Sequence, residues 1–99
     1  MNNHQRDRTR QQAVTSLAPA KVLAAAKEFF ARRSGIYSAF PEKEGPAFLT
    51  LRGQGGEEIA IGVAPGGGGT TVTASSYMFD QQVAHFLSTL PPGSDEAVA

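Results

Sequence analysis

The spacing of apolar residues changes along the chain from a helical period to a strand period. Between Ala18 and Gly35, apolar side chains recur every three to four residues, as on one face of a helix. These residues are Val22, Leu23, Ala26, Phe29 and Phe30. Pro19 suits the first helical turn, where no hydrogen bond is lost, and Gly35 suits a helix end. The pattern therefore predicts a helix over residues 18–35.

Beyond this helix, apolar and polar residues alternate, which is typical of strands with one buried face. Four strands are expected, at residues 36–40, 47–52, 57–63 and 70–75. The segments PEKEG and GQGG between them predict turns, because they are rich in glycine, proline or charge. A further short strand is expected at Ala13–Leu17, ahead of the helix.

A second amphipathic helix is expected near the end of the chain. Its apolar residues have helical spacing and are Phe79, Val83, Phe86, Leu87 and Leu90. Ser75 or Ser76 is the expected cap of its first turn, and Pro91 and Pro92 would end it.

Together these elements predict an α+β fold. Four strands, or five if Ala13–Leu17 joins them, form an antiparallel meander, and the N-terminal and C-terminal helices pack on one face of it. The element order is (β)αββββα, which is similar to that of small helix-on-sheet folds such as the TATA-binding-protein-like and helix-grip classes. A shared element order carries no function by itself. The expected division is a flexible basic arm at residues 1–12, a single domain at 13–92 and a frayed tail at 93–99.

Composition excludes several kinds of site. The 99 residues include no cysteine, so disulfides and thiolate metal sites are ruled out. The two histidines have no partner at metal-ligand spacing, and we expect no metal or cofactor. No apolar run approaches the roughly 20 residues that span a bilayer, and the polar, basic N-terminus does not resemble a secretory signal. A cytoplasmic location is the expectation.

The run of glycines at residues 66–69 raises the question of a phosphate-binding loop. Such a loop needs a following lysine and then a helix, whereas here two threonines and a β-branched strand follow. A hairpin turn is the better interpretation, with a backbone anion site as the alternative.

No arrangement of residues predicts catalysis. Glu57 and Glu58 are adjacent on a strand, so they point to opposite faces. Ser75 and Ser76 have no neighbouring base and no nucleophile-elbow sequence. The expected protein is therefore not an enzyme.

The candidate binding residues lie on the sheet face opposite the helices and in the basic arm. This open face is expected to be flat, with small or mildly polar side chains, which would allow a partner to approach closely. The candidate partner-binding residues are Arg6, Arg8, Arg10, Tyr37, Phe48, Thr50, Arg52, Ala60, Gly62, Thr71 and Thr73. They predict a small accessory or assembly subunit that docks onto another protein or a second copy.

Two other functions remain open at this point. A cavity between helices and sheet could carry a lipid-like or aromatic ligand, and it would be lined by Phe29, Phe30, Phe79 and Phe86. Alternatively, the three arginines of the arm could bind nucleic acid. The acidic remainder of the chain argues against nucleic acid, because basic patches are the usual footprint of such binding.

Overall fold

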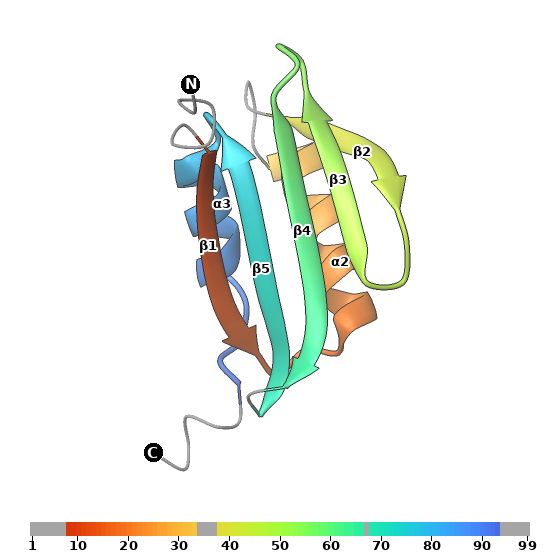
Figure 1. The fold of residues 1–99 in the computed structure, drawn as a ribbon, viewed down its shortest axis with the longest axis vertical. Coiled ribbons are helices and arrows are strands. Elements are labelled where there is room, and N and C mark those ends of the chain that lie inside the picture. Colours follow the sequence, from red (N-terminus) through yellow and green to blue (C-terminus); the bar gives the residue numbers. More distant parts are fainter. Residues whose placement is uncertain (1–7, 34–37, 67, 94–99) are drawn as a thin grey trace.

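The structure, a computed structural model, describes residues 8–33, 38–66 and 68–93. Its elements in chain order are β1 (Arg8–Thr15), α2 (Pro19–Glu28), η1 (Phe29–Arg33), β2 (Ala39–Glu44), β3 (Phe48–Gly53), β4 (Glu58–Gly66), β5 (Gly69–Tyr77) and α3 (Asp80–Ser88). The element η1 is a π-helical turn that continues α2. The five strands form one antiparallel sheet in the order β1-β5-β4-β3-β2 (Figure 1). The predicted α+β fold is confirmed, and the fifth strand belongs to the sheet.

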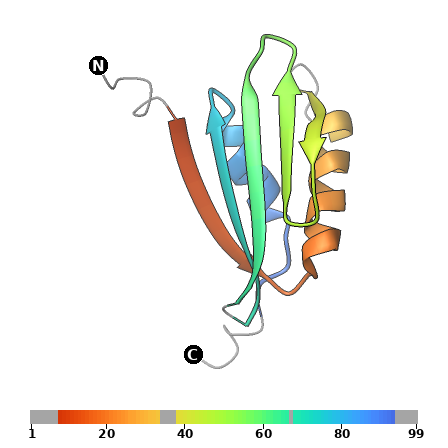
Figure 2. The same cartoon turned by 45° about the vertical axis from the view of Figure 1, so that its right-hand side comes forward.

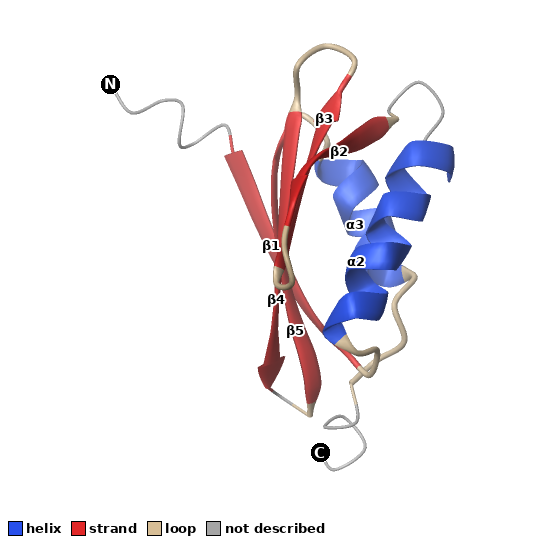
Figure 3. Ribbon diagram, turned by 90° about the vertical axis from the view of Figure 1, so that its right-hand side faces the viewer, coloured by secondary structure: helices blue, strands red, loops and turns tan. Residues whose placement is uncertain are grey.

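Both helices cover the same face of this sheet, and Figure 3 shows them on one side of it. Helix α2 lies against β4, and α3 lies against β1 and β5 (Figures 1 and 2). The opposite face carries no helix among the described residues. The molecule thus has two layers, with one covered and one open sheet face.

The hydrophobic core fills the space between the two layers. Strand β4 alternates as predicted, and its residues Ile59, Ile61 and Val63 are buried toward the helices. The neighbouring strands contribute Leu49, Leu51, Val72 and Ala74, all buried. The helices contribute residues of their apolar faces, including Val22, Phe30, Val83 and Phe86. The same alternation leaves every second strand residue on the open face.

Strand β1 begins earlier than expected. It runs from Arg8 to Thr15 and pairs with β5 over its whole length, so residues 8–12 belong to the sheet instead of to a flexible arm. The expected strand Ala13–Leu17 is therefore corrected at both ends. The helix-facing side of β1 includes the polar residues Gln11 and Thr15, and Gln11 donates a hydrogen bond from Nε2 to the backbone oxygen of Asp80. Because these residues are polar, β1 shows no clear alternation of apolar and polar positions.

Strand β2 is also displaced from its expected place. It spans Ala39–Glu44, so four residues of the expected turn PEKEG are strand. Proline is tolerated there because β2 is an edge strand, and its register shifts between Pro41 and Lys43. The beginning of the expected strand at residues 36–37 lies outside the described residues, as does the expected helix end at Gly35.

The glycine run is a hairpin turn, as predicted. Gly66 pairs with Gly69 at the end of the β4–β5 ladder, and both Gly66 and Gly68 have positive φ, at 146° and 83°. This backbone conformation is open to glycine but costly for other residues. The segment GQGG is likewise a turn, closed by a hydrogen bond from the Gly56 nitrogen to the Gly53 oxygen.

The cap predicted for the last helix is wrong. Ser75 and Ser76 lie in β5, and α3 starts at Asp80 without a side-chain cap. Ser76 instead donates a hydrogen bond to the Asp80 carboxylate at 3.2 Å. The expected frayed tail also begins too early, because the nitrogen of buried Gly93 donates to the oxygen of Val14. Residues 94–99 lie outside the described part of the chain.

Candidate functional site

The open sheet face is organised in rows that the strand register fixes. In one row, Gly62 of β4 lies between Phe48 of β3 and Thr73 of β5. In the next row, Ala60 lies between Thr50 and Ser75, and Ser75 pairs with Arg10 of β1. The smallest side chains therefore occupy the central strand, with larger ones on both sides.

This distribution creates a shallow hollow in the open face. Its volume is about 340 Å³, and it extends over four strands. The lining comprises Arg10 of β1, Thr73 and Ser75 of β5, Ala60, Ile61 and Gly62 of β4, and Phe48 and Thr50 of β3. The floor is Gly62 and Ala60, because they have no long side chain to fill the space. The apolar ring of Phe48, which is 44% exposed, lies on one side, and the cation Arg10 lies on the other.

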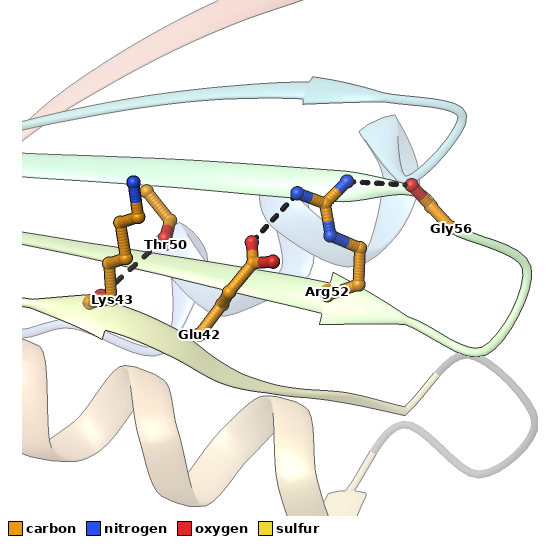
Figure 4. Close-up of polar contacts among 5 residues, drawn as sticks. All are labelled: Glu42, Lys43, Thr50, Arg52 and Gly56. Atoms are coloured by element: carbon orange, nitrogen blue, oxygen red, sulfur yellow. Dashed lines mark hydrogen bonds and ion pairs between the residues drawn. The ribbon is translucent and has the colours of Figure 1, made fainter.

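Arg10 and Arg52, both on the open face, differ in their electrostatic surroundings. Figure 4 shows Arg52 held between the Glu42 carboxylate at 2.7 Å and the Gly56 backbone oxygen at 3.0 Å. The hydrogen bond and charge of Glu42 raise the pKa of the Arg52 guanidinium above its ordinary value. Arg10 has no such partner, since no carboxylate in the described segments forms an ion pair with it. Among the described residues, no carboxylate therefore neutralises the charge of Arg10.

A second polar contact stabilises the β2 side of the face. The hydroxyl of Thr50 lies 3.5 Å from the backbone oxygen of Lys43, its register partner on β2 (Figure 4). Thr50 thus lines the β2 side of the hollow, beside the exposed cation Lys43.

Most of the predicted partner-binding residues come together on this face. Six of them line the hollow: Arg10, Phe48, Thr50, Ala60, Gly62 and Thr73. Arg52 and Thr71 lie on the same face outside it, at their own register positions. Arg8 pairs with Tyr77 in the β1–β5 ladder. Arg6 and Tyr37 lie outside the described residues.

Sequence reasoning missed three residues of this surface. Ser75 lines the hollow, and Tyr77 is 43% exposed at the end of the same strand. Both continue the alternation of Thr71 and Thr73, and they were overlooked because the strand was expected to end where the helix cap began. Gln12 pairs with Thr73, and sequence reasoning missed it because no apolar residue between Asn2 and Gln12 indicates a strand there.

The four phenylalanines considered for a ligand cavity lie in the core. All four are buried, and Phe30 is fully inaccessible. The rings of Phe29, Phe30 and Phe86 contact one another with centroid distances of 5.1 to 5.6 Å. Such distances are those of packed aromatic side chains, so the arrangement supports a core role.

Within the described residues, no helix is both long and apolar enough to cross a membrane. Comparison with family models, with curated proteins and with solved structures gave no match.

Proposed function

We propose that the protein is a non-catalytic interaction module, an accessory or assembly subunit that binds a protein partner through its open sheet face. The hollow over Ala60 and Gly62 is the observation that carries this proposal. A solvated sheet face ordinarily has strongly polar side chains, whereas this one has small residues at its centre. Small residues leave room for a projecting group of a partner.

The shape of the face favours a different protein over a second copy. If two copies met face to face about an axis through the hollow, one depression would lie over the other and leave a void. Interfaces pack as densely as protein interiors, so such a void would weaken the contact. A partner with a projecting side chain would fill the space and bury the exposed ring of Phe48.

The proposal is tested by filling the hollow. Gly62→Val adds three carbons to its floor, and Ala64→Val is the matched control on the same strand and face, outside the hollow. The tagged full-length protein is purified from its source at moderate salt, and the affinity for any stoichiometric partner is then measured. We expect Gly62→Val to weaken binding at least tenfold, about 1.4 kcal/mol, because it occupies a partner's anchor position.

The control decides between a local and a general effect. Ala64→Val should retain the partner within about twofold of the wild-type affinity, a difference well under 1 kcal/mol. If the two variants bind equally well, or if the wild-type protein is a monomer that retains no partner, the proposal is wrong.

A further inference from the structure

The two edges of the sheet differ in how open they are to another strand. Strand β2 is irregular, with Pro41 in it and a register shift before Lys43. Proline, bulges and charges are the usual means of protecting an edge from strand addition. Strand β1 carries the charge of Arg10, but it has no proline and no register shift, and it stays in register with β5 from Arg8 to Thr15. The β1 edge is therefore the one prepared for strand addition.

One end of the β1 edge shows which backbone groups point outward. The Gly93 nitrogen donates to the Val14 oxygen at 3.1 Å, and Thr15 forms an antiparallel bridge with Pro92. In antiparallel strands the backbone groups of successive residues point to alternate sides. The N–H and C=O groups of Gln12 and Arg10 thus point outward, as the C=O group of Val14 does. No described residue pairs with them there.

The positive charge of Arg10 on β1 favours an added strand that carries negative charge. The side chain of Arg10 is exposed on the open face and has no carboxylate partner among the described residues. A second copy is a poor fit in either kind of register. In some registers an arginine of its β1 would lie opposite Arg10. In the others its β1 would extend to Val14, whose backbone oxygen already accepts a hydrogen bond from Gly93. Directly opposed like charges destabilise strand pairs, and opposite charges stabilise them.

We propose that an extended, acidic segment of a protein partner adds to β1 as a sixth strand. Its backbone would bond to the outward groups of Arg10 and Gln12, and a carboxylate on alternate residues would lie beside Arg10 on the open face. Strand addition of this kind obtains affinity from the main chain and specificity from alternate side chains. A nucleic acid lacks the alternating amide groups that this edge can pair with. The inference rests on the proposed function and names the class of partner.

The test uses two fluorescein-labelled ten-residue peptides and the full chain. One peptide alternates glutamate with valine and threonine, and the other has lysine in place of glutamate. Binding is followed by fluorescence polarisation at low salt. Gln12→Pro removes an outward N–H without breaking a bond to β5, and Gln12→Ala is its matched control. Melting curves verify that each variant is folded.

We expect the acidic peptide to bind, and the lysine peptide to bind at least tenfold more weakly. Gln12→Pro should reduce affinity at least tenfold, and Gln12→Ala should stay within about twofold, because it keeps the N–H. Arg10→Glu should reverse the preference between the peptides, since it reverses the charge beside the added strand.

Five results would overturn this inference. The first four are no binding of the acidic peptide up to about 1 mM, equal affinity for the two peptides, equal affinity of Gln12→Pro and Gln12→Ala, and a dimer of the wild-type chain that Gln12→Pro dissociates. The fifth is a rise of more than tenfold in affinity for the acidic peptide when Asp95 and Glu96 are replaced by Asn and Gln, which would indicate that the chain's own acidic residues occupy the edge. Gly62→Val should leave peptide binding unchanged, so failure of the edge and failure of the open face are distinguishable.

Discussion

Replacing Gly62 by alanine is expected to stabilise the fold. Gly62 is in the interior of β4 and is not among the described residues with positive φ. A Cβ built on it would have its nearest neighbour, the backbone oxygen of Ala47, 4.0 Å away. The position therefore accepts a side chain without strain or collision. The backbone geometry of the fold therefore does not require glycine at this position.

The magnitude follows from backbone entropy. Glycine within a strand destabilises a protein by roughly 0.5–1 kcal/mol relative to alanine, because the unfolded chain has more freedom to lose. For a domain of this size, 1 kcal/mol shifts the melting temperature by about 4–8 °C. Gly62→Ala should thus raise the melting temperature by about 2–8 °C.

Gly56→Ala is the informative comparison. Its Cβ would meet nothing within 4 Å, but Gly56 has φ of 93°. The same added methyl should therefore lower stability there, by roughly 1 kcal/mol or more. Thermal unfolding by circular dichroism and urea titration at matched pH measure both variants. If Gly62→Ala melts below the wild type while Gly56→Ala does not, the reasoning from backbone conformation and free space is refuted.

Three further substitutions test the packing and the ion pairs of the fold. Phe30→Ala should cost about 3–5 kcal/mol in urea unfolding, because a fully buried ring is removed; a cost below about 1 kcal/mol would show that the core can collapse around it. Gly69→Ala should destabilise by about 1–3 kcal/mol, since its Cβ would collide with the backbone oxygen of Thr15, and an unchanged melting temperature would contradict that close approach. Glu42→Gln should cost less than about 1 kcal/mol in the same titration, because the pair with Arg52 is about half exposed, and a larger loss would mean that the pair stabilises more than its surface position suggests.

The sequence was most informative where one side of an element is apolar. The helical spacing of Val22, Leu23 and Phe30 and the alternation of Ile59 and Ile61 led directly to the confirmed element order. It was least informative at the two edge strands. On the helix side of β1 the residues are largely polar, and β2 buries only Ala39, so neither strand has a clear two-residue period.

The composition of the open face could be predicted, but its hollow could not. Alternation along β4 alone assigns Ala60 and Gly62 to the face opposite Ile61. Which residues flank them depends on the register between strands, which is set by turn geometry and by pairing of distant segments. The pairing of Ser75 with both Ala60 and Arg10 is such a relation. The lack of an ion pair between Arg10 and any described carboxylate also depends on the three-dimensional positions of those carboxylates.

The pairing of β1 with β5 has a consequence for how the protein folds. The ladders from β2 to β5 join strands that follow one another along the chain, whereas Arg8 must find Tyr77. Closing such a long loop costs more entropy than closing a hairpin, so β1 should dock late. During synthesis at about 5–20 residues per second, the first strand would wait roughly 4–14 s for its partner to be made. Until β5 is made the edge of β1 has no partner, and this interval is when the nascent chain would most need protection by a chaperone.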